Sequence, residues 1–266
     1  MSGNDLRGAV LEARDITVRF GGFVAVNDAS LTAHPGQVTS LIGPNGAGKT
    51  TMFHAISGIL NPDGGAAYLD GRSLKGMTPD KRARAGMART FQILELFSGL
   101  SVAENLQVAV EGRASQHIWR DLFSLRHPDN PAVLRRVREA MDLVGIADLA
   151  DRPAGSLPTG LSRLVELARA LCTEPKVLLL DEPASGLSNA ETERLHSVLA
   201  SLADLGLTIL LVEHDIELVM ALSSQIYVLD FGRMIAQGTP AQVRQDPVVR
   251  AAYLGADLDE DAVVDA

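Results

Sequence analysis

The stretch Gly43-Pro44-Asn45-Gly46-Ala47-Gly48-Lys49-Thr50 follows an apolar run, Val38–Ile42, and leads into a segment of helical character that extends to about Ile59. It fits the phosphate-loop pattern G-x-x-x-x-G-K-[ST] without gaps. The glycines let backbone N–H groups turn towards phosphate oxygens, and the following helix presents the positive end of its dipole. We therefore predict that residues 43–51 hold the phosphates of ATP. Lys49 would reach the β- and γ-phosphates, Thr50 would ligate Mg²⁺, and Thr51 would complete the cradle.

A second polar group ends the segment Val177-Leu178-Leu179-Leu180-Asp181-Glu182. A continuous apolar run is typical of a strand covered on both faces. A carboxylate at the carboxyl end of such a strand lies where α/β folds bind ligands. We predict that Asp181 holds Mg²⁺, directly or through water, and that Glu182 polarises the attacking water. The Asp-Glu pair alone is a weak signal, and its combination with the phosphate loop makes it a strong one.

Strand patterns alternate with helical patterns along the chain, which predicts an α/β fold with a largely parallel sheet. Thr208–Val212 has the pattern of another buried strand, and Gln225–Leu229 and Arg233–Gln237 have the pattern of late strands joined by a turn. Val10–Phe20 and Ala66–Leu69 alternate, as in an antiparallel sheet. We predict a P-loop NTPase (RecA-like) core with an antiparallel β edge subdomain.

Helical spacing replaces strand patterns between Ile93 and Thr173. One helix is predicted around Val133–Val144, where Gly145 would stop it, and another around Leu161–Leu171. We predict a single domain in which residues 9–92 and 174–255 form the α/β core with its β edge, and residues 93–173 form an inserted α-helical subdomain. Residues 112–131 are expected to be a partly helical excursion, and residues 256–266 an acidic tail.

Composition narrows the function classes. The 266 residues carry a formal net charge of −9, which argues against non-specific binding to nucleic acid because such binding needs an excess of Lys and Arg. The single cysteine, Cys172, has no internal partner for a disulfide, as expected in a reducing compartment. We expect no signal peptide at the N-terminus and no membrane-spanning segment, because no apolar run approaches about 18 residues. Any work at a membrane would then need another chain to span it.

These motifs together resemble the ATP-binding subunits of ABC transporters over nearly the full length of the chain. The resemblance implies a Mg-dependent ATPase. It assigns Gln92, in Ala88-Arg89-Thr90-Phe91-Gln92, to Mg²⁺ sensing between the subdomains, and His214, in Leu211-Val212-Glu213-His214, to the γ-phosphate. It also implies an aromatic residue stacked on adenine. Phe20 fits that role best, with Phe23 as the competitor.

The family signature, usually Leu-Ser-Gly-Gly-Gln, departs from its pattern here. The matching residues are Leu157-Pro158-Thr159-Gly160-Leu161. By resemblance, Thr159 and Gly160 complete the ATP site of a second ATPase subunit, in a homo- or heterodimer. Pro158 has no hydroxyl to replace the serine, and Thr159 is the candidate substitute. Ser188 lies where the family usually has an aspartate, and Ser188-Asn189-Ala190-Glu191 predicts a capping box for the next helix.

Within this family, the chain resembles the larger ATPase subunit of branched-chain amino acid importers. It rests on Phe20–Asp28, Ala88–Gln92, the excursion after Leu106 and the ending Tyr253-Leu254-Gly255. Transmembrane permease subunits and, indirectly, an extracytoplasmic solute-binding protein are the implied partners, and the cytoplasmic face of the membrane is the implied location. Urea and short-amide importers, an iron–sulfur assembly ATPase and a non-catalytic regulatory cassette are the alternatives.

The surface predicted to receive a permease helix is the segment from Gln92 to Leu100. Its apolar residues are too closely spaced to face one core, so some are expected to be exposed: Ile93, Leu94, Leu96, Phe97 and Leu100. The alternative is that all of them pack inside the helical subdomain.

Overall fold

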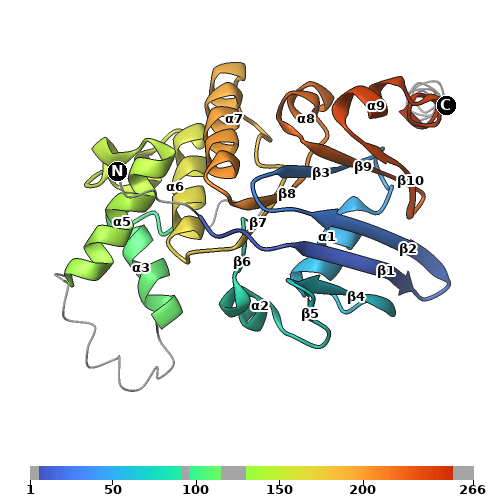
Figure 1. Ribbon diagram of the computed structural model, residues 1–266. Helices are drawn as coiled ribbons and strands as arrows, with labels where there is room; N and C mark the ends of the chain where they lie inside the picture. The colour runs from blue at the N-terminus through green and yellow to red at the C-terminus, as the bar shows by residue number, and fades with distance from the viewer. Residues whose placement is uncertain (1–5, 91–95, 115–129, 254–266) are drawn as a thin grey trace.

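The computed structural model describes residues 6–90, 96–114 and 130–253 (Figure 1). Within these ranges, the strands form two sheets. The larger has the order β10-β9-β3-β8-β7-β6, and all neighbouring pairs are parallel except β9 with β10. Its strands are β3 (Val38–Ile42), β6 (Met87–Arg89), β7 (Val177–Asp181), β8 (Thr208–Val212), β9 (Gln225–Asp230) and β10 (Arg233–Gly238). Every residue of β3, β7 and β8 is buried, which confirms the prediction of a covered parallel sheet.

The smaller sheet is antiparallel, with the order β2-β1-β4-β5. Its strands are β1 (Leu11–Phe20), β2 (Phe23–Ala33), β4 (Gly64–Leu69) and β5 (Arg72–Ser73). The sequence predicts β1 and β4 but not β2. The pairing of β1 with β2 contains register shifts, and Asp28 within β2 has a φ of +55°, so the strict alternation that marks a strand is interrupted.

Helix α1 (Lys49–Ser57) lies between the two sheets (Figure 1). Met52, Phe53 and Ile56 are fully buried in a core that includes residues of both sheets. The helix ends two residues earlier than predicted because Gly58 adopts a left-handed conformation there. The buried guanidinium of Arg82 donates hydrogen bonds to the carbonyls of Ala55 and Ile56 and closes this end of the helix.

Helices α3 (Val102–Ala114), α5 (Pro131–Val144) and α6 (Thr159–Leu171) pack on one another at the left of Figure 1. Gly145 ends α5 with a φ of +69°, as predicted. Single 3₁₀ turns at Ala147–Leu149 and Ala154–Ser156 connect α5 to α6. The boundaries of the helical subdomain stay a prediction, and most of the excursion at 112–131 lies outside the described residues, as does the acidic tail.

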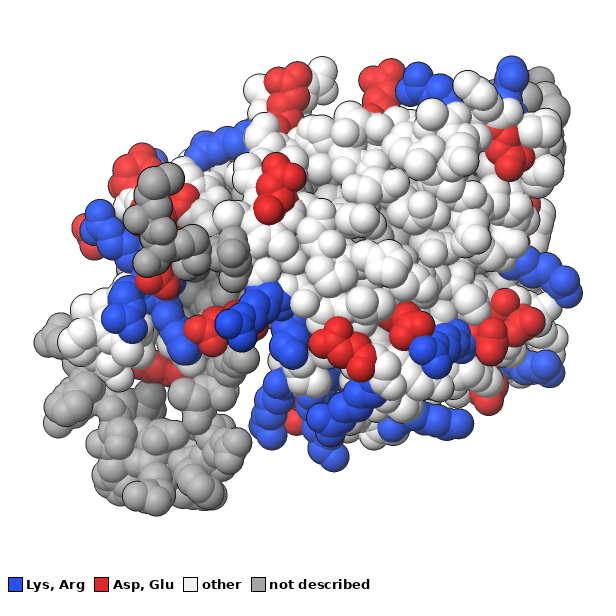
Figure 2. Space-filling model, viewed as in Figure 1, with Lys and Arg blue, Asp and Glu red and all other residues white. Residues whose placement is uncertain are grey.

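The remaining helices are α2 (Pro79–Ala85), α7 (Asn189–Asp204), α8 (Ile216–Leu222) and α9 (Pro240–Gln245). Figure 2 shows Lys and Arg side chains gathered along the lower edge of one face, over α2, β4 and β5. Exposed residues of this edge are Arg72, Lys75, Lys81 and Arg84. Among the described helices, none is both long and apolar enough to cross a membrane.

Candidate functional site

Strand register brings the predicted site residues to one edge of the larger sheet. Leu41 on β3 and Asp181 on β7 both pair with Val212 on the strand between them, β8. The chain therefore leaves three adjacent strands at the same level, towards Gly43, Glu182 and Glu213. This is the carboxyl edge of the parallel strands, where α/β sheets bind ligands.

The phosphate loop requires glycine at its first position. Gly43 has a φ of +153°, and a Cβ there would overlap the carbonyl oxygen of Leu229 on the neighbouring strand. At the other end of the loop, Gly48 has a φ of +101°, and a Cβ would overlap the carbonyl oxygen of Ala25 on β2. The loop is thus held closely between β9 and β2.

The N-terminus of α1 is suited to binding an anion. Gly48 supplies no side-chain cap, and the first turn contains no acidic residue, so its N–H groups point to the loop without a carboxylate of their own. Lys49 is buried, and its Nζ donates hydrogen bonds to the carbonyl oxygens of Gly43 (2.7 Å) and Pro44 (3.0 Å). Burial lowers the pKa of Lys49, while the carboxylates of Glu182 and Asp181 raise it.

Asp181 is a buried carboxylate of this edge, with a side chain only 3% exposed. Its Oδ2 lies 3.3 Å from the Nη2 of Arg89, and the other Nη of that guanidinium donates to the hydroxyl of Ser57 at 3.0 Å. Burial raises the pKa of Asp181 and the charge of Arg89 opposes this shift. Glu182 follows with a φ of +47°, and its N–H donates to the Val212 carbonyl.

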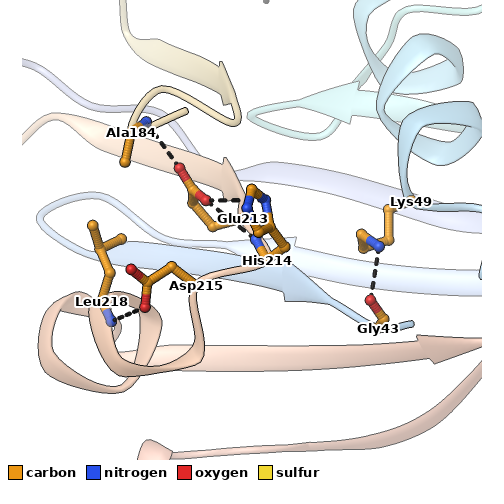
Figure 3. Close-up of polar contacts among 7 residues, drawn as sticks. All are labelled: Gly43, Lys49, Ala184, Glu213, His214, Asp215 and Leu218. Carbon is orange, nitrogen blue, oxygen red and sulfur yellow. Dashed lines mark hydrogen bonds and ion pairs between the residues drawn. The ribbon is translucent and has the colours of Figure 1, made fainter. Parts of the chain in front are cut away.

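Glu213 links two loops of the site (Figure 3). Its Oε1 accepts a hydrogen bond from the N–H of Ala184 at 3.0 Å, and its Oε2 accepts one from the N–H of His214 at 3.1 Å. Burial raises the pKa of Glu213, and these two N–H donors oppose that shift. Asp215 then caps α8 through the N–H of Leu218. The imidazole of His214 is mostly exposed, with its Nδ1 3.7 Å from Glu213 Oε2.

Gln92 lies outside the described residues, as do Ile93 and Leu94. Phe20 and Phe23 face each other at the turn between β1 and β2 and are 53% and 66% exposed, so either ring is accessible to adenine.

The signature residues begin α6. Thr159 is its first residue and is exposed, whereas Gly160 is buried and Pro158 stands at the N-cap without a side-chain hydrogen bond. The N–H of Gly160 donates to Oε1 of Glu191, on the first turn of α7, at 3.2 Å. The predicted capping box of α7 is present, because Ser188 donates to Oε2 of the same carboxylate.

Three polar residues of this region were not predicted as site residues from the sequence: Arg89, Glu213 and Glu191. A charged residue directly after or at the end of a buried strand is the available signal for Arg89 and Glu213. The sequence predicts Glu191 only as part of a helix cap. Its contact with Gly160 is not predicted, because the two residues are 31 positions apart.

The residues present fit a magnesium-bound nucleoside triphosphate. The uncapped start of α1 and the close loop around it suit phosphate oxygens, and Lys49 adds a positive charge. Asp181 and the Thr50 hydroxyl offer the oxygen ligands that Mg²⁺ prefers.

A family model described as "ABC transporter" matches residues 26–185, and one described as "Branched-chain amino acid ATP-binding cassette transporter" matches residues 233–259. The chain is 42% identical over 254 residues to the high-affinity branched-chain amino acid transport ATP-binding protein BraF of Pseudomonas aeruginosa, covering 92% of this chain and 98% of BraF. It is 41% identical over 250 residues to LivG of Escherichia coli (strain K12), which bears the same description, with the same coverage.

The lipopolysaccharide export system ATP-binding protein LptB of Escherichia coli (strain K12) is 34% identical over 250 residues, covering 94% of this chain and 99% of LptB. Among solved structures, the ADP conformation of MJ1267, an ATP-binding cassette of an ABC transporter, superposes with a TM-score of 0.82 at 30% identity, covering 93% of this chain and 99% of MJ1267. The chain therefore belongs to the ABC transporter family, as one of its ATP-binding subunits.

Proposed function

We propose that this ATPase binds Mg-ATP at the carboxyl edge of the larger sheet and hydrolyses it to drive import of branched-chain amino acids. The observation that carries the proposal is the strand register, which places the phosphate loop, Asp181, Glu182 and the Glu213-His214 pair side by side. A triphosphate site needs all of these functions within reach of one γ-phosphate.

Each side chain has a role that its surroundings support. Lys49 binds the β- and γ-phosphates, exchanging its two carbonyl partners for phosphate oxygens. Thr50 and Asp181 hold Mg²⁺, which neutralises charge on the phosphates. Glu182 orients the attacking water and accepts its proton. His214 contacts the γ-phosphate from a loop that Glu213 holds in place, and Gln92 is proposed to sense the metal.

The solute is proposed from the relatives. BraF and LivG are named for high-affinity branched-chain amino acid transport at 42% and 41% identity, whereas the relative named for lipopolysaccharide export is 34% identical. The match of residues 233–259 to a branched-chain amino acid model agrees with this choice.

A groove beside the site is the proposed seat of a permease helix. It has a volume of about 480 Å³ and lies between α2, β6, α3 and α6, with lining residues that include Ile59, Ala83, Ala109 and Arg169. Phe97 is 49% exposed, and its ring lies 5.6 Å from the guanidinium carbon of Arg169. An apolar groove rimmed by charged residues suits an amphipathic helix.

A second ATPase subunit is proposed to complete the site. Thr159 and Gly160 begin α6, and their match to the family signature supports a role in binding the γ-phosphate of the partner subunit's nucleotide. Two subunits related by a two-fold or pseudo-two-fold axis would then share two ATP molecules.

The test is ATP turnover by the chain purified together with its permease subunits. We expect turnover to require Mg²⁺, to be lost on addition of EDTA, and to rise when a solute-binding protein loaded with leucine is added. Lys49→Ala should weaken ATP binding itself. Turnover that is insensitive to EDTA would contradict the proposed metal site, and stimulation by urea but not by leucine would move the proposal to another solute.

A further inference from the structure

Helix α6 begins without a capping side chain of its own. Pro158 at the N-cap carries neither a hydroxyl nor an N–H, and the first turn of this 13-residue helix contains no acidic residue. The N–H groups at such a start need an acceptor. Glu191 of the neighbouring helix α7 supplies one.

The carboxylate of Glu191 serves two helix N-termini at once. Its Oε2 accepts from the N–H of Ser188 at 2.9 Å and from the hydroxyl of Ser188 at 2.7 Å, which caps α7. Its Oε1 accepts from the N–H of Gly160 at 3.2 Å, which caps α6. The two helices lie side by side in Figure 1.

The contact with Gly160 is close as well as polar. A Cβ at position 160 would overlap Oε1, Cδ and Cγ of Glu191. The side chain therefore lies directly over the Cα of Gly160. The hydrogen bonds from Ser188 and, less strongly, from Gly160 hold the pKa of Glu191 below its usual value, so the group is an anion at neutral pH.

We propose that Glu191 is an internal competitor of ATP: its carboxylate occupies the N–H of Gly160 and must leave before the γ-phosphate of a partner subunit's nucleotide can bind there. The inference rests on the proposed function, in which Gly160 completes the partner's site. A carboxylate and a phosphate repel each other and cannot both take one N–H group. Because Ser188 holds the other carboxylate oxygen, Oε1 can leave Gly160 without loss of the α7 cap.

The contact thus sets a threshold for closure of the two ATPase subunits. Without nucleotide, Glu191 supplies a hydrogen-bond acceptor for the N–H of Gly160 at the start of α6, which Pro158 leaves uncapped. With nucleotide, closure has to displace one charge-assisted hydrogen bond. The consequence is a lower affinity between ATP-loaded subunits than the signature alone would give.

The test compares Glu182→Gln, which is expected to retain ATP, with Glu182→Gln/Glu191→Gln. Glutamine at 191 keeps the capping box of α7, because Gln serves at this position as Glu does, and it removes the charge that faces Gly160. We expect the dissociation constant of the ATP-bound dimer, measured by analytical ultracentrifugation, to fall about tenfold in the double variant, the effect of one hydrogen bond to a charged group. Glu182→Gln/Glu193→Gln, which removes an exposed charge from the same helix, should leave the constant unchanged.

Two further measurements on the variants accompany the sedimentation experiment. Selective ¹⁵N-glycine spectra of the nucleotide-free chain should show that Glu191→Gln shifts the amide resonance of Gly160, and thermal melting should show that the fold is intact. An unchanged or weaker dimer in the double variant would overturn the inference and make Glu191 a structural cap only. If the Glu182→Gln parent itself does not associate with ATP, the proposed two-subunit site fails first, and the inference fails with it.

Discussion

Gly43 occupies a backbone position where a side chain would meet the main chain of a neighbouring strand. Its φ of +153° and the proximity of the Leu229 carbonyl oxygen both exclude a Cβ. Gly46, in the same loop, also has a positive φ, +76°, but no atom stands where its Cβ would lie. A comparison of alanine substitutions at the two positions therefore separates the cost of steric overlap from the cost of backbone strain.

We predict that Gly43→Ala lowers the free energy of unfolding by at least about 2 kcal/mol, since the added methyl group must displace backbone. Gly46→Ala should cost about 1 kcal/mol, from its positive φ alone. Urea unfolding followed by circular dichroism measures both. Equal costs for the two variants would contradict the close packing of the loop against β9.

Arg89 shows what a sequence motif leaves out at the residue scale. The phosphate-loop pattern and the Asp-Glu pair identify Lys49 and Asp181, because these residue types at these spacings are rare without a nucleotide site. The partner of Asp181 comes from a parallel strand 92 positions away, and only the sheet order brings it near. The contacts of Glu213 with Ala184 and of Glu191 with Gly160 were likewise not predicted, because they join residues 29 and 31 positions apart.

At the scale of elements, α1 depends on α2 for its C-terminal end. Arg82 reaches from α2 to carbonyl oxygens of Ala55, Ile56, Leu74 and Met77, and it is 3% exposed. Its neighbour Lys81 is exposed and serves as a control.

Arg82→Met should lower the free energy of unfolding by about 2–4 kcal/mol, because the carbonyls lose a charged donor while they stay buried. Lys81→Met should change it by less than about 0.5 kcal/mol. Thermal unfolding followed by calorimetry compares the two. A loss for Arg82→Met no larger than for Lys81→Met would show that water replaces the guanidinium.

The start of α6 carries a second prediction at this scale. If the exposed hydroxyl of Thr159 replaces the serine of the usual signature, Thr159→Val should weaken ATP-driven dimerisation in the Glu182→Gln background by about three- to tenfold. Thr159→Ser keeps the hydroxyl and should retain dimerisation. Sedimentation in the presence of ATP measures the dissociation constant of the dimer. An unchanged dissociation constant in Thr159→Val would leave Gly160 as the sole contact of the signature with nucleotide.

Elements with an uninterrupted period were predicted well from sequence. β3, β7 and β8 are buried on both faces and give continuous apolar runs, and α5 shows a clear helical face ended by Gly145. β2 was missed because its alternation is broken where β1 and β2 shift register. The three residues of β6 are too few to give a period at all.

At the scale of the whole molecule, ATP hydrolysis has to be transmitted to a membrane-spanning partner. The groove next to Arg89 and Thr90 lies between the sheet that holds Asp181 and the helices α3 and α6. A permease helix seated there would sense any movement between these two parts. Among the described apolar residues of the predicted surface, Leu96, Phe97 and Leu100, it is Phe97 that is exposed.

Phe97→Glu should weaken association with the permease subunits by about tenfold or more, the cost of a charge in an apolar contact, and should leave ATP binding intact. Val248→Glu places a charge at another exposed apolar residue and should change neither. A pull-down with the permease subunits measures association, and an ATP-binding assay on the same variants measures nucleotide binding. Retention of permease binding in Phe97→Glu would exclude this surface, and loss of ATP binding as well would mean misfolding.

In the proposed function, this chain powers transport by hydrolysing ATP with Glu182 as the base. The most direct measurement places wild-type and Glu182→Gln chains, each with the permease subunits and binding protein, in vesicles and follows ATP binding, ATP turnover and leucine uptake together. We predict that Glu182→Gln binds ATP normally, that its turnover falls by roughly 10²–10⁴, a barrier change of about 3–5.5 kcal/mol, and that leucine uptake is lost with it. Turnover and uptake near the wild-type level in Glu182→Gln would contradict it.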